Sequence, residues 1–98
     1  MPSYRVVLTV GLLRPGVAAA DVLPASAAAA RARTTVEAYD VGVVHGRPRL
    51  TVRYTSDDDA LGLAVGRVVR ATAATLVDVL DSAITRRYGN RWYEVRDR

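Results

Sequence analysis

The chain has 98 residues, a formal net charge of +4 and no cysteine. The lack of cysteine excludes a disulfide framework, a thiolate nucleophile and a metal site with cysteine ligands. Half of the residues are hydrophobic, so we expect a single domain over residues 1–98 with a core of its own. No apolar run approaches the ~20 residues of a membrane span, and we expect a cytoplasmic protein without a membrane partner.

All fourteen basic residues are arginine, and none is lysine. One explanation is a compositional bias that also enriches alanine and valine. The other is a need for planar donors that bind an anion through two hydrogen bonds, which lysine cannot supply. The positive charge permits an anionic partner without requiring one.

The first predicted element is a strand over residues 4–13, where large apolar residues occupy every second position. Turn residues at positions 14–16 end it. An alanine-rich helix follows over residues 21–33, with Asp21 as its N-cap and Pro24 in its first turn, where a missing N–H costs little. Because its face is nearly all alanine, we expect this helix to lie flat and close on the sheet.

Two predicted strands flank a turn at His45-Gly46. The register of the first, residues 34–44, is ambiguous because acidic residues fall in both side-chain rows, and a bulge within residues 37–40 would reconcile them. The second strand has the clearest alternation in the chain. Its two faces differ in polarity, with Leu50, Val52 and Tyr54 on one and Arg49, Thr51, Arg53 and Thr55 on the other.

Apolar residues at helical spacing predict a second helix over residues 57–80, begun by the acidic run at residues 57–59. Gly62 and Gly66 weaken this helix, which indicates a close packing contact. Its predicted buried face consists of Leu61, Val65, Val68, Thr72, Leu76 and Val79.

A last β-rich segment begins at Ala83, and its Gly89-Asn90 dipeptide is typical of a two-residue hairpin loop. In that register Arg87 lies opposite Trp92, where the two side chains form a cation–π pair. The order strand–helix–strand–strand–helix–strand predicts an α+β fold of the ferredoxin-like split βαβ type. We therefore expect an antiparallel sheet with two helices on one face and an extra C-terminal edge strand.

The uncovered face of that sheet is the first candidate site. Arg49, Thr51 and Arg53 should stand on it beside Arg5 and Val7 of the neighbouring strand. Such a face can bind phosphates, carboxylates or the sheet of another subunit, or it can simply be solvated. RNA binding in the manner of an RRM sheet is disfavoured, because its central strands lack exposed aromatic residues.

The second candidate site is the C-terminal segment, in which five arginines are interleaved with three aromatic residues between positions 86 and 98. This mixture suits single-stranded nucleic acid and a protein interface equally well. We interpret individual pairs as internal contacts and the cluster as an interface. Its candidate residues are Arg86, Arg87, Arg91, Trp92 and Tyr93.

Catalytic and metal-binding signals are weak. Capping and the helix dipole already explain the acidic run at residues 57–59, and no second acidic cluster has ligand spacing. The only histidine, His45, falls in a predicted turn. Nucleophile elbows, glycine-rich phosphate loops and paired-carboxylate motifs are missing from the sequence. We expect no catalytic residue, no cofactor and no metal.

The preferred interpretation is a non-catalytic interaction domain that forms a homo-oligomer, most simply a dimer, or binds another protein, through the open sheet face or the C-terminal hairpin. The alternative is an anion or single-stranded nucleic-acid binder that uses Arg49, Arg53, Arg86, Arg87, Arg91 and Trp92. A second alternative is a small enzyme of the dimeric α+β-barrel type, a resemblance of fold alone. Its pocket would need inward-facing polar groups, whereas the inward rows here are Val, Leu and Ala.

Overall fold

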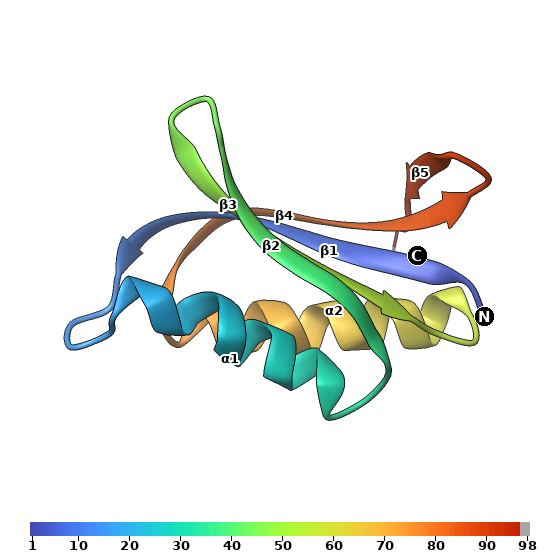
Figure 1. The fold of residues 1–98 in the computed structure, drawn as a ribbon, viewed down its shortest axis with the longest axis horizontal. Helices are drawn as coiled ribbons and strands as arrows, with labels where there is room; N and C mark the ends of the chain where they lie inside the picture. The colour runs from blue at the N-terminus through green and yellow to red at the C-terminus, as the bar shows by residue number, and fades with distance from the viewer. Residues whose placement is uncertain (97–98) are drawn as a thin grey trace.

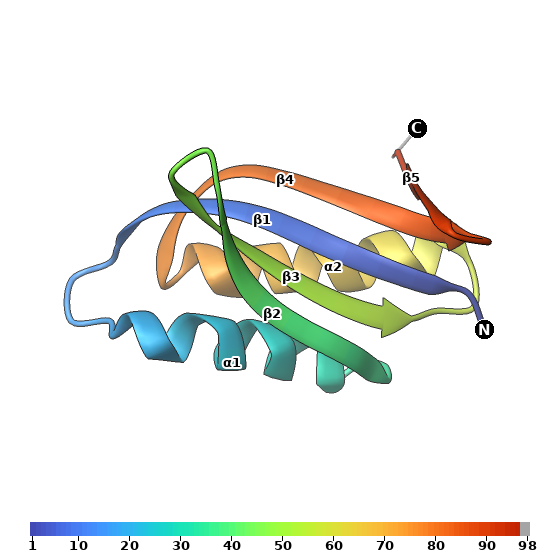
Figure 2. The same ribbon diagram turned by 45° about the horizontal axis from the view of Figure 1, so that its top comes forward.

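The computed structural model describes residues 1–96 (Figure 1). Its elements in chain order are β1 (Ser3–Leu13), α1 (Ala19–Arg31), β2 (Val36–Val44), β3 (Arg47–Thr55), α2 (Asp59–Ala74), β4 (Val77–Tyr88) and β5 (Arg91–Glu94). The strands form one antiparallel sheet in the order β2-β3-β1-β4-β5. Both helices lie against one face of the sheet, and the other face is uncovered (Figure 2). This is the predicted α+β ferredoxin-like arrangement with an added C-terminal edge strand.

The two central strands build the core by strict alternation. Tyr4, Val6 and Leu8 of β1 are almost completely buried, and they lie directly opposite β3 residues that are equally buried. Those partners are Tyr54, Val52 and Leu50. Because both rows point to the helices, the intervening residues of both strands stand on the open face. The predicted alternation in these two strands is confirmed.

The first helix begins two residues earlier than expected. Its N-cap is Ala18, which has no side chain to cap the helix, and Asp21 lies within the first turn instead. Pro24 consequently falls in the second turn. Its missing N–H removes one intrahelical hydrogen bond there. The buried face consists mainly of small side chains, Val22, Ser26, Ala27 and Ala30, which bring the helix close to the sheet as predicted.

The second helix corrects the sequence prediction. It ends at Ala74, and residues 77–80 begin β4 instead of continuing the helix. The carboxylate of Asp58 caps it by accepting the Leu61 N–H at 2.9 Å. The buried face is rotated from the predicted one, since Leu61 is 51% exposed. It consists of Gly62, Val65, Gly66, Val69 and Ala73.

Both predicted hairpins are present. His45 and Gly46 have φ values of 52° and 77°, the pair of left-handed residues that a type I′ turn requires. Gly89 at the β4–β5 turn also has a positive φ, 59°. In β2 a register shift between Val36 and Ala38 places a bulge at residue 37, within the predicted range. The β4–β5 ladder has the predicted pairs Tyr88↔Arg91, Arg87↔Trp92 and Arg86↔Tyr93.

The two hairpins rise from the uncovered side of the sheet at opposite ends (Figure 1). The β2–β3 hairpin stands at one end, and the β4–β5 hairpin curls upward at the other. The open face is therefore bounded on two sides. Within residues 1–96, no helix combines the length and apolar character that crossing a membrane requires.

Candidate functional site

The open face is organised in rows of residues that lie opposite one another on neighbouring strands. The middle row is small and uncharged on the three inner strands, where Thr51, Val7 and Ala83 stand side by side. Charged residues occupy the rows on either side of it. One row consists of Arg49, Thr9 and Asp81, and the other of Arg53, Arg5, Thr85 and Glu94.

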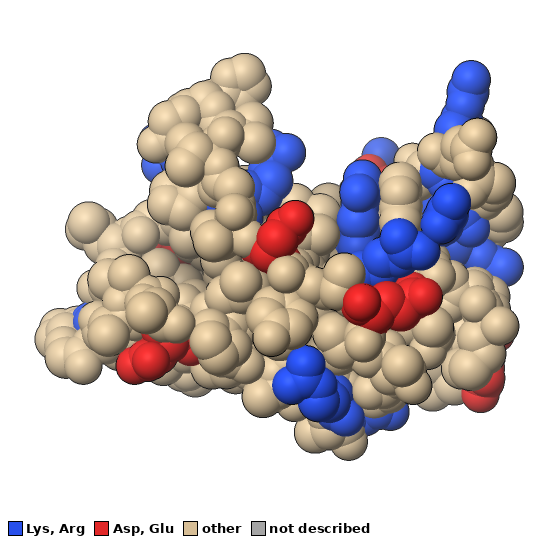
Figure 3. Space-filling view, viewed as in Figure 1, with Lys and Arg blue, Asp and Glu red and all other residues tan. Residues whose placement is uncertain are grey.

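Charges of both signs share this face in almost equal number. In Figure 3 basic and acidic atoms lie next to one another on the side that carries the two hairpins. By register and side-chain direction, the strands place five arginines and four carboxylates of the described residues on this face, apart from Arg96, which follows β5 and pairs with Glu94 at 3.4 Å. They are Arg5, Arg47, Arg49, Arg53 and Arg87, with Glu37, Asp40, Asp81 and Glu94.

Two arginines, Arg5 and Arg53, lie directly opposite each other on β1 and β3. Like charges in this position repel, so other groups must compensate. The Trp92 ring provides one compensation, because its centroid is 4.4 Å from the Arg5 guanidinium carbon and 5.3 Å from that of Arg53. Glu37 provides the other by accepting a hydrogen bond from Arg53 Nε at 3.2 Å.

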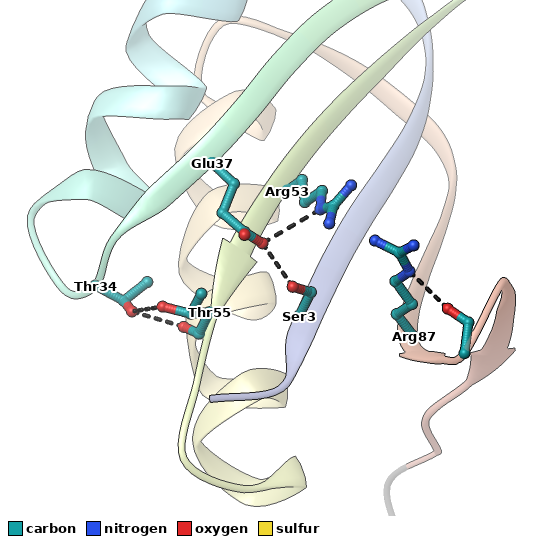
Figure 4. A network of polar contacts seen from close by, with 7 residues as sticks. Ser3, Thr34, Glu37, Arg53, Thr55 and Arg87 are labelled. Carbon is teal, nitrogen blue, oxygen red and sulfur yellow. Dashed lines mark hydrogen bonds and ion pairs between the residues drawn. The ribbon is translucent and has the colours of Figure 1, made fainter.

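Glu37 is itself held in place from two strands (Figure 4). Its carboxylate accepts the Ser3 hydroxyl at 2.7 Å and the Arg53 guanidinium, while Arg87 extends towards the same region from β4. The Ser3 hydrogen bond, followed by Arg53, lowers the pKa of Glu37 below its usual value. The carboxylate therefore stays ionised next to the arginines.

The position of Trp92 corrects one predicted contact. Its ladder partner is Arg87 as expected, but its ring lies beside Arg5 and Arg53. The reason is that the β4–β5 hairpin curls over the open face, which carries the ring across to β1 and β3. Arg87 instead donates from Nε to the Gly89 carbonyl at 2.7 Å. The open face and the C-terminal hairpin are thus one continuous surface.

Several polar atoms of this surface have no hydrogen-bond partner within residues 1–96, although they are shielded from solvent. They are Arg5 Nε, Arg49 Nε and Thr85 Oγ1. A shielded donor without an acceptor costs about 1–3 kcal/mol, and more when it is charged. Acceptor groups brought from outside the chain would remove that cost.

The structure separates the eight candidate residues into two sets. Arg49, Thr51, Arg53, Arg87 and Trp92 stand on the open face. The other three, Arg86, Arg91 and Tyr93, alternate to the opposite side of β4 and β5. Tyr93 packs edge-on against the Tyr88 ring, 5.6 Å between centroids. Arg98, the last of the five C-terminal arginines, lies outside the described residues.

Arg86 belongs to a polar cluster beneath the sheet. Its Nη1 donates to Asp59 Oδ1 at 2.9 Å, and the Tyr4 hydroxyl donates to the same oxygen at 2.6 Å. Burial and the hydrogen bond to Asp59 raise the pKa of Tyr4 to about 12, while the Tyr4 and Arg86 hydrogen bonds lower the pKa of Asp59. Both groups keep one protonation state near neutral pH, so the cluster ties β1 and β4 to α2.

A groove on the helix side of the sheet was not predicted from the sequence. It lies between the start of α1 and the β2–β3 hairpin, with a volume of about 560 Å³. Every residue that lines it is apolar, glycine or proline, so it offers no side chain for acid, base or nucleophilic chemistry. Residues 1–96 also contain no group of three His, Asp or Glu side chains placed to hold a metal ion.

Comparison with known proteins gives little further guidance. No family model matches the chain, and no curated protein matches it. Among solved structures, the chain is similar to Rv0793 from Mycobacterium tuberculosis, with 21% identity over 90% of this chain and 94% of that one and a TM-score of 0.47. A likeness at this level carries no argument about function.

Proposed function

We propose that this protein is a non-catalytic interaction domain that self-associates through its open sheet face, with the β4–β5 hairpin as one wall of the contact. The proposal rests on an arginine nitrogen on this face that is shielded from solvent and has no acceptor within residues 1–96. This atom is Arg49 Nε, while Asp81 lies in the same row of the face on the far side of β1. A second copy of the face would bring both acceptors and donors.

A face that carries both charges can be complementary to itself. When a two-fold axis runs along β1 between two stacked sheets, β3 of one copy lies over β4 of the other. Arg49 then faces the partner's Asp81, and the symmetry repeats this pair. The small row around Val7 lies at the centre of the contact, where it permits close approach. The same axis brings Arg5 close to the partner's Arg5, where the Trp92 ring of its own chain covers each guanidinium and the contact supplies no acceptor.

Charge exchange at Arg49 and Asp81 tests this arrangement. We expect wild-type protein to sediment as a dimer and the Asp81→Arg variant to dissociate at least about tenfold more readily, because each contact then opposes two arginines. The double variant Arg49→Asp, Asp81→Arg should recover dimerisation. Ala28→Arg, on the exposed side of α1, is the matched control and should leave the mass unchanged. A monomer at millimolar concentration, or a double variant no better than Asp81→Arg, would overturn the proposal.

One observation favours the alternative of anion or single-stranded nucleic-acid binding. Arg5 and Arg53 lie side by side, and the charge of Arg87 also acts on Glu37 from β4. A salt-titrated binding assay with single-stranded DNA separates the two functions. An anion site would lose affinity in Arg5→Ala and Arg53→Ala, and its salt slope would shrink by about 0.7 per lost phosphate contact. An interface between copies would show no such binding. A cytoplasmic location stays a proposal, which cell fractionation would test.

A further inference from the structure

The outer strand β2 carries an apolar row that its own chain covers only in part. Tyr39, Val41 and Val43 are 46%, 58% and 73% exposed. Their ladder partners on β3 are Val52, Leu50 and Pro48, so the row points to the helix side of the sheet, the side of the core. The sequence pattern that buries Leu50 and Val52 is therefore present in β2, but α1 covers the row only in part, through the Arg31 guanidinium 5.8 Å from the centroid of the Tyr39 ring.

This row borders the apolar groove. Val41 and Val43 form one wall of the groove, and the first turn of α1 forms the other at Ala19 and Ala20. In Figure 3 the β2–β3 hairpin is mostly uncharged on the side that faces the viewer, with basic atoms at its edges. The row and the groove together make one apolar surface at this end of the molecule.

The backbone of the same residues is also unpaired on its outer side. Hydrogen-bonded and non-hydrogen-bonded pairs alternate along an antiparallel ladder, and a two-residue turn closes on a hydrogen-bonded pair, here Val44↔Arg47. The N–H and C=O groups of Tyr39, Val41 and Val43 therefore point away from β3. Pro48 agrees with this phase, because it has no N–H and lies opposite Val43 in a non-hydrogen-bonded pair.

The exposed edge lacks the features that usually prevent strand addition. Proteins protect such edges with lysine, proline, bulges or inward-pointing charges. Residues 39–44 contain no lysine, arginine or proline, their one charged residue, Asp40, lies on the open face, and the bulge at residue 37 lies outside them. The edge is open along six residues.

We propose that a second copy of this chain pairs with β2 through its own β2, in antiparallel register with Val41 at the two-fold axis. Val41 then lies opposite the partner's Val41, and Tyr39 opposite the partner's Val43. All outward backbone groups of residues 39, 41 and 43 are paired, which gives about six hydrogen bonds. The two apolar rows become one, and the partner's Tyr39 lies beside Val43 at the mouth of the groove.

The position of the charged residues favours the register centred on Val41, and it favours a second copy of the chain as the partner. With Val41 at the axis, Asp40 lies opposite the partner's Gly42, and Glu37 opposite the partner's His45. Moving the axis to Asp40 would place two carboxylates against each other, which is destabilising. Moving it to Gly42 would set Tyr39 against the partner's turn residue His45 and lose two regular pairs. The match between the edge and its own copy is what favours a second copy over an unrelated peptide.

This contact is independent of the open-face dimer. The β2 edge and the open face are different surfaces, and each is related to itself by a two-fold axis. A protein that uses both would form a closed tetramer or an open filament, whereas use of one alone stops at a dimer. A variant that blocks one contact therefore leaves the other to be measured.

Single-cysteine variants test the register directly, because the chain has no cysteine of its own. Paired Cα atoms about 5.5 Å apart are within reach of a disulfide. We expect Val41→Cys to cross-link with itself under mild oxidation. Val43→Cys and Tyr39→Cys should each cross-link poorly alone but well when mixed. Cross-linking of all three alone, or of none at a concentration where the protein associates, would overturn the register.

Amide exchange of the wild-type protein gives a measurement that requires no variant. We expect the amides of Tyr39, Val41 and Val43 to exchange at least about tenfold more slowly at high than at low protein concentration. Val41→Lys should abolish that change without lowering the melting temperature, since the side chain is exposed. Val7→Arg, which blocks the open face, should leave it intact. Outer β2 amides that stay unprotected at every concentration would show that the edge does not pair.

Discussion

At the end of the sheet where α2 begins, Tyr4 and Tyr54 stack with 6.1 Å between ring centroids, and the Tyr54 hydroxyl donates to the Gly62 carbonyl at 2.6 Å. At the opposite end, around the β2–β3 hairpin, the same side of the same sheet leaves a groove and an exposed row that includes Val41 and Val43. One end is closed by glycine-mediated contact with a helix. The other has apolar side chains that the nearby helix α1 covers only in part.

The difference shows that burial here depends on which element covers a residue more than on how apolar the residue is. Val41 and Val52 are both valines on the helix side of adjacent strands, yet one is 58% and the other 1% exposed. We conclude that apolar residues at the closed end stabilise the fold, while those at the hairpin end are available to another chain. Paired substitutions, one at each end, test this contrast.

The largest contrast should come from two tyrosines on neighbouring strands. Tyr54→Ala removes a fully buried ring and should lower the free energy of unfolding by about 3–5 kcal/mol. Tyr39→Ala removes a half-exposed ring and should cost less than about 1 kcal/mol. Urea denaturation of both variants under monomeric conditions measures the difference. Equal losses would mean that the hairpin end is packed as firmly as the other.

Two adjacent valines of α2 provide a smaller contrast. Val69 is fully buried, whereas Val68 is half-buried. Val69→Ala should cost about 2 kcal/mol from lost burial and the cavity left behind, and Val68→Ala less than half of that. Thermal melts of the two variants check the rotation of the helix. A larger loss at Val68 would restore the face expected from the sequence alone.

Two glycines, one at each end of the sheet, allow the effect of adding a single methyl group to be compared. A Cβ on Gly62 would lie 2.8 Å from the Tyr4 ring, which stacking and the Asp59 hydrogen bond hold in place. Gly62→Ala should therefore destabilise the protein by about 1–2 kcal/mol, despite the better helix propensity of alanine. Gly42→Ala meets nothing within 4 Å and should change stability by less than about 0.5 kcal/mol. Chemical denaturation decides, and a stabilised Gly62→Ala variant would mean that the ring can move.

A last contrast is confined to alkaline pH. The pKa of Tyr4 is raised to about 12 in the folded protein, above its ordinary value near 10. Its contribution to stability is therefore complete below pH 10 and is lost as the pH rises from about 10 to about 12. Tyr4→Phe should lose less stability across that range than wild type. Parallel denaturation curves at pH 8 to 12 test this, and an unchanged slope in Tyr4→Phe would contradict it.

The sequence predicted the elements in which local pattern and tertiary structure agree. The alternation in β1 and β3 and the two hairpin turns were correct because each is encoded by residues close together in the chain. The predicted second helix was too long because that prediction also relied on local spacing alone. Thr72, Leu76 and Val79 continue a helical spacing, and no glycine or proline marks the two-residue link before β4 begins at Val77.

The features that the sequence did not predict depend on how the β4–β5 hairpin curls over the sheet and on where α1 lies relative to β2. The cation–π contacts of Trp92 with Arg5 and Arg53 follow from the curl of the β4–β5 hairpin over the sheet, which no local pattern encodes. The groove follows from where α1 lies relative to β2. The sequence did hold one indication of the groove. Val41 and Val43 repeat the apolar alternation of a buried strand, although they belong to the edge strand of the sheet.

Trp92 is the only tryptophan in the chain, and its ring lies beside the guanidinium groups of Arg5 and Arg53 on the open face. Its fluorescence is therefore a built-in optical reporter for that face alone. Covering the face would withdraw the indole from water and shift its emission to shorter wavelength, whereas pairing at the distant β2 edge would leave the spectrum unchanged. A single dilution series, followed by both emission and mass, would assign each association step to its surface.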